Sequence, residues 1–173
     1  KPKNLGKWLW DFNAKELPED ARNDDSPHAR KGRRGFSGTL FKTDGFLKAH
    51  PFGTVPAAFS PDGAVGIFES NSILRAAARA GRNKTNLYGE DGFQASRIDS
   101  FLDASLVFAR EAQVYLLSVE SLSQENYARM HAAYEFYLSG IKAALEVSKY
   151  LAGDELTIAD ISFVCDVGQF LRE

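Results

Sequence analysis

The segment that most constrains the fold is residues 51–80, where two short apolar runs lead directly into a helix-forming run. The apolar runs, residues 55–59 and 65–68, are separated by the strong turn sequence Pro-Asp-Gly, so they predict a β-hairpin. Residues 73–80 are rich in alanine and predict a helix, which a glycine at position 81 would end. This part of the chain is therefore expected to be mixed α/β.

The rest of the chain has a helical pattern. Residues 93–119 and 124–150 predict two long helices, and the apolar residues of the second recur at spacings of three and four. Thr157 and Asp160 indicate the start of a further helix. They form a capping box, in which the Thr157 hydroxyl accepts from the Asp160 amide and the Asp160 carboxylate accepts from the Thr157 amide.

The order of these patterns predicts two domains. Residues 1–80 are assigned to the α/β domain, residues 81–91 to a polar linker and residues 92–173 to an α-helical domain. Short strands are also expected at residues 7–12 and 38–41. Residues 18–34 read as an exposed loop or a poorly ordered segment, because they are rich in turn-forming and charged residues.

Composition excludes several classes of function. The formal net charge of -2 gives no general case for nucleic acid or an acidic membrane, and no apolar run approaches the roughly 20 residues of a membrane span. The chain has one cysteine, Cys165, so an internal disulfide is impossible and a reducing, cytoplasmic location is expected. No metal site is predicted.

The basic residues gather in the first part of the chain. Residues 1–50 carry 11 Lys or Arg against 7 Asp or Glu, and the excess peaks at Arg30–Arg34. A solvated loop is the simplest interpretation, because no aromatic residues interleave with these charges as they do in single-strand binders. Binding of nucleic acid through this segment is kept as the weakest alternative, and nucleic acid is not an expected partner.

Candidate chemistry lies at what we expect to be opposite ends of the hairpin. The Val55–Pro56 bond is a place for a cis peptide, which would leave the Val55 main chain open to an extended peptide; an ordinary trans-proline is the alternative. Ser70 is predicted to cap the following helix, whose N-terminal N–H groups attract a carboxylate, and Glu69 can pair with an ammonium group. A plain helix cap is the alternative. Together the two features suit glutathione, whose free amino-acid end adjoins ordinary amides.

Several motifs resemble those of cytosolic glutathione transferases. HPFGTVP (residues 50–56), the hairpin and FESNSI (residues 68–73) resemble the second half of their thioredoxin-like domain, and GDELTIADISF (residues 153–163) is similar to part of their helical domain. The resemblance covers residues 39–173 and looks closest to the theta and phi classes and to the transferase-like domain of elongation factor one gamma. It implies an α/β thioredoxin-like N-terminal domain followed by an all-α helical bundle.

The resemblance also implies which residues bind glutathione. Val55 would pair its main chain with the glutathione cysteine, Pro56 would be the cis proline, and Glu69 and Ser70 would hold the γ-glutamyl group. Thr54 stands where many members carry Gln or Lys. The implied glutathione-binding residues are completed by Lys42, which falls near the position of a basic residue for the glycyl carboxylate.

The catalytic residue remains unassigned. Family members place a Tyr, Ser or Cys at the end of the first strand to stabilise the glutathione thiolate, the nucleophile of the reaction. Residues 1–25 contain none of these residue types. The N-terminal part is therefore expected to be reorganised, to lack residues, or to stabilise the thiolate through backbone N–H groups or Asn13. The C-terminus is expected to be incomplete, because family members continue with further helices.

The leading hypothesis is a glutathione transferase that uses the thiolate of its co-substrate glutathione against a hydrophobic electrophile, as in detoxification. A thiol-dependent reduction or a lyase step is the alternative reaction. Phe108 and Tyr115 are candidate wall residues of the second-substrate pocket, and helix–helix core is the alternative for both. The second hypothesis is a non-catalytic module that serves protein association. A homodimer is expected from the resemblance alone.

Overall fold

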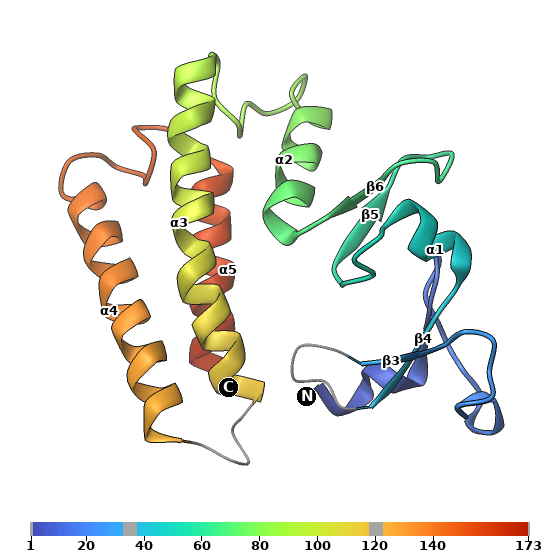
Figure 1. Cartoon of the computed structure of the whole chain (residues 1–173). Helices are drawn as coiled ribbons and strands as arrows, with labels where there is room; N and C mark the ends of the chain where they lie inside the picture. Colours follow the sequence, from blue (N-terminus) through green and yellow to red (C-terminus); the bar gives the residue numbers. More distant parts are fainter. Residues whose placement is uncertain (1, 33–37, 118–122, 173) are drawn as a thin grey trace. The chain divides into compact units, whose positions relative to one another are not determined.

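The computed structural model describes residues 2–32, 38–117 and 123–172. The chain divides into two compact units, Lys1–Ile73 and Leu74–Glu173, of which the first is mixed α/β and the second is helical (Figure 1). This confirms the predicted fold class. The division falls inside helix α2, Ser70–Ala80. The domain limits expected at residues 80 and 92 stay a prediction.

The first unit contains a four-stranded sheet with the strand order β2-β1-β4-β3. The central strands β1, Trp8–Trp10, and β4, Thr39–Lys42, are parallel, and their paired residues Leu9 and Phe41 are buried. The outer strands β2, Lys15–Glu16, and β3, Ala29–Lys31, pair antiparallel with β1 and β4 respectively. Two short 3-10 helices, Pro2–Lys7 and Glu19–Ala21, complete this part.

Parallel neighbours need a crossover connection, which is usually a helix. Here the chain passes from β1 to β4 through β2, the 3-10 helix Glu19–Ala21 and β3. The strands expected at residues 7–12 and 38–41 are confirmed as β1 and β4. The prediction of a loop throughout residues 18–34 is wrong, because Arg30 and Lys31 pair with Leu40 and Thr39 in the sheet.

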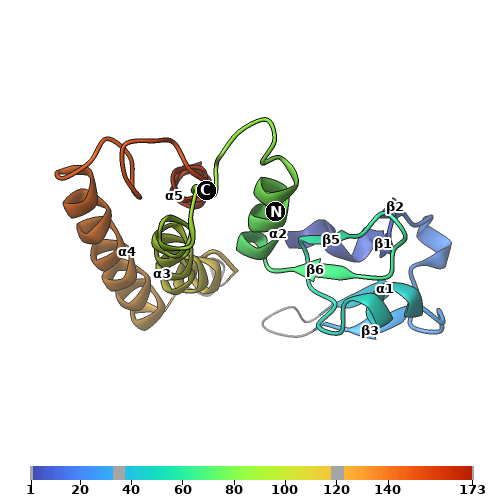
Figure 2. The same ribbon diagram turned by 90° about the horizontal axis from the view of Figure 1, so that it is seen from above.

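The predicted hairpin forms a second sheet. Strands β5, Ala57–Phe59, and β6, Gly66–Phe68, pair antiparallel after the short helix α1, Asp44–Ala49 (Figure 2). Aromatic rings join these elements to the end of β1. Phe59 meets Phe46 of α1 edge-on at 5.7 Å between ring centroids and Phe12 at 4.8 Å.

The second unit is built around α3, Gly92–Leu117, which packs against both α4, Gln124–Leu145, and α5, Ile158–Arg172 (Figure 1). The predicted helix over residues 124–150 ends five residues early. The reason is local, because the Ser148 hydroxyl donates to the carbonyls of Ala144 and Tyr150 and the Tyr150 amide donates to the Gly153 carbonyl. None of the described helices is both long and apolar enough to cross a membrane.

The capping box at the start of α5 is present with one change. The Asp160 carboxylate accepts from the Thr157 amide at 2.9 Å, as predicted. It also accepts from the Thr157 hydroxyl at 3.0 Å and from the Leu151 amide at 2.9 Å. The predicted bond from the Asp160 amide is wrong, because the Thr157 hydroxyl accepts from the Ala159 amide at 3.2 Å instead.

Asp166 of α5 gives the helical unit a pH-dependent contribution to stability. Burial raises the pKa of its carboxyl group, while hydrogen bonds from Ser105 and Ser162 act in the opposite direction. Burial and the proximity of Asp166 also raise the pKa of Tyr137 to about 12. A carboxyl whose pKa is higher in the folded chain binds more protons there than in the unfolded chain. Its contribution to stability is therefore lost as pH rises through the folded pKa.

We therefore expect Asp166→Asn to raise the Tm at pH 7, where the charged carboxylate is a net cost. The difference in Tm between variant and parent should shrink as pH falls towards 4. Thermal unfolding followed by circular dichroism at both pH values measures this difference. Asp154→Asn removes an exposed carboxylate of the same unit and should leave the Tm unchanged at both pH values. An Asp166→Asn protein that melts at or below the parent's Tm at pH 7 would contradict the expectation.

Candidate functional site

The candidate site lies at the open end of the β5–β6 hairpin. The last paired residues at this end are Ala57 and Phe68. Val55 lies two residues before Ala57, and Ser70 lies two residues after Phe68. The prediction that Val55 and Ser70 lie at opposite ends of the hairpin is wrong. Antiparallel strands bring the residue before the first strand and the residue after the second to the same end, which brings the two predicted binding features together.

The main chain of Val55 is open. The Val55–Pro56 peptide is cis, as predicted, and strand β5 begins only at Ala57. Within the described parts of the chain, the amide and carbonyl of Val55 form no backbone hydrogen bond. Its side chain is 41% exposed. An extended peptide can pair with such a segment through main-chain hydrogen bonds.

Glu69 has an unusual backbone conformation for a residue with a side chain. Its φ is 67°, in the left-handed region, and its carbonyl accepts the first helical bond of α2 from Ile73 at 3.0 Å. Such conformations cost about 1–3 kcal/mol and occur often at ligand sites. The prediction that Ser70 caps the helix is wrong by one position, because Glu69 occupies the cap and Ser70 is the first helical residue.

The side chains of Glu69 and Ser70 are both exposed. Neither forms a hydrogen bond or an ion pair with the residues that the structure describes. A carboxylate and a hydroxyl thus adjoin the N-terminal N–H groups of α2, which attract anions. This arrangement can accept an ammonium group and a carboxylate from one ligand.

Lys42 and Thr54 lie close to this end of the hairpin. The Lys42 ammonium group donates to the Gly53 carbonyl at 2.5 Å, which brings it beside the loop that precedes Val55. The Thr54 amide donates to the imidazole Nε2 of His50 at 3.0 Å. The structure therefore gathers the predicted residues Lys42 and Thr54 near Val55, and their contacts with glutathione stay predictions.

His50 is a residue of this site to which the sequence motif gave no role. Its side chain is fully buried, with 0% exposure. The ring stacks on Phe68 at 4.7 Å between centroids and meets Phe46 edge-on at 5.6 Å. A histidine among aromatic residues is the only signal in the sequence that could have suggested this position.

The two predicted wall residues of a second-substrate pocket differ in their surroundings. Phe108 is 1% exposed and stacks on Tyr137 at 5.5 Å, so the alternative of helix–helix core is correct for it. A side chain enclosed in this way presents no surface to a substrate. Tyr115 is half-buried at the edge of the same core, 6.2 Å from the ring of Tyr127, and its role stays a prediction.

The residues that follow β1 serve folding contacts. Asp11 accepts a hydrogen bond at 2.8 Å from Thr43, whose hydroxyl also caps α1, and Phe12 packs on Phe59. Asn13 is exposed, and its role in stabilising a thiolate stays a prediction. The place where the family positions its catalytic Tyr, Ser or Cys is thus occupied by other residue types.

The basic segment is partly paired. Arg30 forms an ion pair with Asp44 at 2.7 Å and donates to the carbonyls of Pro27 and Ala29. Arg33 and Arg34 lie outside the described residues.

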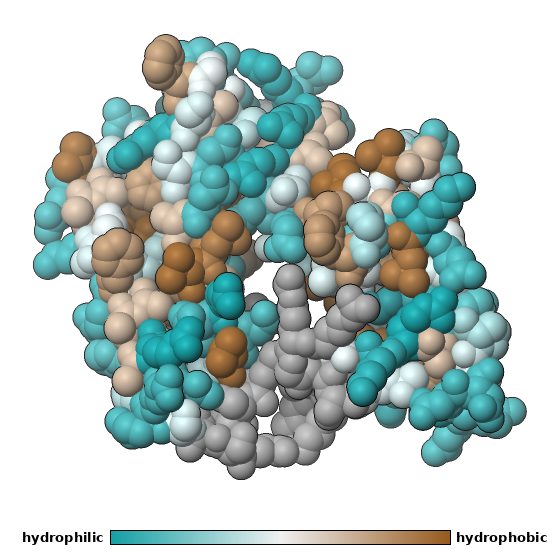
Figure 3. Space-filling view, in the orientation of Figure 1, coloured by the Kyte–Doolittle hydropathy of each residue, from teal (hydrophilic) through white to brown (hydrophobic). Residues whose placement is uncertain are grey.

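On the face shown in Figure 3, apolar side chains form several separate patches among polar ones.

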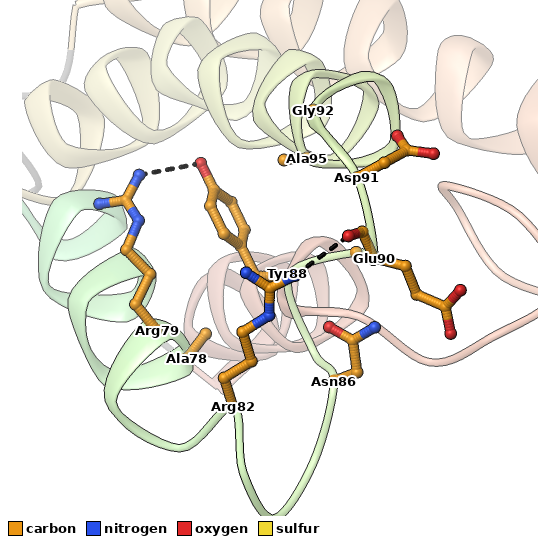
Figure 4. A pocket seen from close by; sticks show the side chains of 10 residues that line it. Ala78, Arg79, Arg82, Asn86, Tyr88, Glu90, Asp91, Gly92 and Ala95 are labelled. Carbon is orange, nitrogen blue, oxygen red and sulfur yellow. Dashed lines mark hydrogen bonds between the residues drawn. The ribbon is translucent and has the colours of Figure 1, made fainter.

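A cavity of about 320 Å³ lies in the helical unit between the end of α2 and the start of α3 (Figure 4). The two arginines that line it, Arg79 and Arg82, bind other residues of the chain. Arg79 lies over the ring of Tyr88 and donates to its hydroxyl, and Arg82 donates to the Glu90 carbonyl. The Tyr88 hydroxyl in turn donates to Asp99, which also pairs with Arg75. This network ties α2 to α3 and includes none of the predicted glutathione residues.

Comparison with known proteins identifies similar sequences, although no family model matches the chain. Elongation factor 1-gamma 3 of rice is 31% identical over 75% of this chain. A glutathione S-transferase-like protein of a Fusarium species, LUC7, is 30% identical over 70% of this chain. The chain spans about a third of the length of the rice protein and 57% of the Fusarium protein.

Solved structures of similar fold are glutathione transferases. Glutathione transferase F2 of Populus trichocarpa matches with a TM-score of 0.57 and 26% identity, over 75% of this chain and 63% of that protein. Glutathione S-transferase 1-6 of Anopheles dirus matches with a TM-score of 0.60 and 20% identity, over 75% and 62% respectively. By sequence and by fold, the chain belongs to the cytosolic glutathione transferase-like superfamily.

Proposed function

We propose that the chain binds glutathione at the open end of the β5–β6 hairpin. The observation that carries this proposal is the meeting, at one end of the hairpin, of the open Val55 main chain with the exposed Glu69 and Ser70 side chains. A peptide with a free amino-acid end needs both kinds of group. The names of the similar solved structures, which are glutathione transferases, support the same ligand.

Each end of the ligand has a counterpart in the site. The cysteinyl amide groups pair with the amide and carbonyl of Val55 beside Pro56. The γ-glutamyl ammonium pairs with the Glu69 carboxylate. The γ-glutamyl carboxylate binds the Ser70 hydroxyl at the N-terminal end of α2, whose dipole attracts anions. The glycyl carboxylate lies towards Lys42 and Thr54.

We further propose that bound glutathione reacts with a hydrophobic electrophile. The cysteinyl thiol loses its proton to solvent, and the thiolate forms a carbon–sulfur bond as the leaving group departs with the electron pair of the broken bond. The thiolate is stabilised by main-chain N–H groups or by Asn13. A homodimer in the cytoplasm, with an α/β domain over residues 1–80 and a helical domain over 92–173, is part of this proposal.

A second function, protein association without catalysis, is favoured by one observation. The residues that follow β1, Asp11, Phe12 and Asn13, include no Tyr, Ser or Cys. The elongation factor 1-gamma relatives support the same alternative by their names. Conjugation of glutathione to an aryl halide, followed by absorbance, separates the two functions, because a protein that binds glutathione without accelerating conjugation is the non-catalytic module.

Ser70→Ala is expected to weaken glutathione binding by about 1–3 kcal/mol, the range for losing a hydrogen bond to a charged group. Isothermal titration calorimetry at fixed salt measures the Kd. Ser72→Ala removes a hydroxyl from the same helix and should leave the Kd unchanged. An unchanged Kd for Ser70→Ala would exclude Ser70 from the head-group contact, and a parent protein that is not retained on immobilised glutathione would exclude the site as a whole.

A further inference from the structure

His50 is held rigidly behind the proposed site. The residue follows the last residue of α1, and its backbone carbonyl accepts from the Gly53 amide at 2.9 Å. Its ring lies parallel to Phe68 of β6, with an interplanar angle of 3°, and edge-on to Phe46 of α1. These two aromatic contacts restrict the plane of the imidazole ring.

The polar contacts of this ring are directed at one residue. Nε2 lies 3.0 Å from the amide nitrogen of Thr54, 2.9 Å from its carbonyl oxygen and 3.3 Å from its hydroxyl oxygen. Nδ1 is buried and has no partner among the described residues. The hydrogen bonds of this ring to the described residues thus all run through Nε2 to Thr54, and they restrain the conformation of that residue.

Thr54 immediately precedes Val55, whose open main chain is the proposed peptide-binding edge. Val55 itself has no backbone hydrogen bond among the described residues, so its conformation depends on its neighbours. Lys42 holds the Gly53 carbonyl on one side, and His50 holds Thr54. Pre-ordering a binding segment improves affinity because the ligand does not have to order it.

We infer that His50 is a positioning residue for glutathione binding, which fixes the Thr54 main chain and thereby presents the amide and carbonyl of Val55 to the ligand. This inference rests on the proposed function. It assigns His50 no contact with glutathione and no part in the chemistry. Its effect is on the affinity for glutathione, through the order of residues 53–55.

The test compares His50→Gln with His50→Met. The two side chains have the same length, but only glutamine can accept from the Thr54 amide. We expect His50→Gln to bind glutathione within about twofold of the parent and His50→Met to bind at least about fivefold more weakly, since an unpaired buried donor costs about 1–3 kcal/mol. His131→Gln, which changes an exposed histidine of the helical unit, is the matched control.

A second measurement does not depend on the ligand. Hydrogen exchange of the Thr54 amide, followed by NMR without glutathione, should be slow in the parent and in His50→Gln and fast in His50→Met. Equal affinities and equal exchange rates in all three proteins would overturn the role of His50 and leave the proposed function intact. An equal loss in both variants would overturn the hydrogen bond as its basis. A parent that fails to bind glutathione would overturn the proposed function and this inference with it.

Discussion

Gly66→Ala is expected to lower the free energy of unfolding of the first unit by about 3 kcal/mol, the upper part of the range for overpacking. A Cβ atom at this position would lie 2.3 Å from the carbonyl oxygen of Ala49 and 2.8 Å from its carbonyl carbon. Both atoms belong to backbone at the end of α1, which cannot rotate away as a side chain can. Strand β6 or helix α1 must therefore move.

Urea unfolding followed by tryptophan fluorescence measures this loss, because both tryptophans of the chain, Trp8 and Trp10, lie in β1 of the first unit. Gly140→Ala is the control. A Cβ there would meet nothing within 4 Å, and alanine favours a helix over glycine by about 1 kcal/mol. Because Gly140 lies in α4 of the helical unit, this variant should not lower the stability of the first unit. A Gly66→Ala protein as stable as its parent would mean that β6 and α1 are not in close contact.

Asp160→Ala is expected to lower the free energy of unfolding of the helical unit by about 3 kcal/mol. Its carboxylate accepts hydrogen bonds from the amides of Leu151 and Thr157 and from the Thr157 hydroxyl. Leu151 and Thr157 are both buried, so water cannot replace the lost acceptor. An unsatisfied buried donor costs about 1–3 kcal/mol, and two amide donors lose their partner here.

The helical signal in circular dichroism at 222 nm follows this loss during urea unfolding. Asp160→Asn keeps one acceptor oxygen in the same place and should recover about half of the stability. Asp154→Ala, which removes an exposed carboxylate nearby, should have no effect. Equal stability of Asp160→Ala and the parent would show that the capping box does not hold the Leu151 turn to α5.

Features set by local chemistry were predictable from the sequence. The hairpin follows from a turn sequence between two apolar runs, and the start of α5 follows from Thr157 and Asp160. The outer strands β2 and β3 were not predictable. They contain two and three residues, mostly charged, and they form because β1 and β4 offer edges to pair with. Such pairing depends on contacts distant in sequence and leaves no alternation of apolar residues.

The candidate site also combines features that the local sequence predicts with features that depend on contacts distant in sequence. Val55, Pro56, Glu69 and Ser70 could be selected from their motif, but their common end of the hairpin follows only from the strand register. The left-handed φ of Glu69, directly before the start of α2, runs against the preference of its residue type and could not be predicted from it. Burial of His50 and Phe108 depends on rings from other elements, which spacing along the chain does not reveal.

The segment that connects β1 to β4 could be replaced by the corresponding segment of another protein. It begins after Trp10, contributes the two outer strands β2 and β3, and ends at Thr39 on the strand that lies directly beside β1. Two such neighbouring attachment points can be joined by many chains of sufficient length. The connecting segment begins where glutathione transferases place their thiolate-stabilising side chain. A transplanted transferase crossover would therefore exchange the activating group and its support in one step, while the residues proposed to bind glutathione at the β5–β6 hairpin kept their sequence.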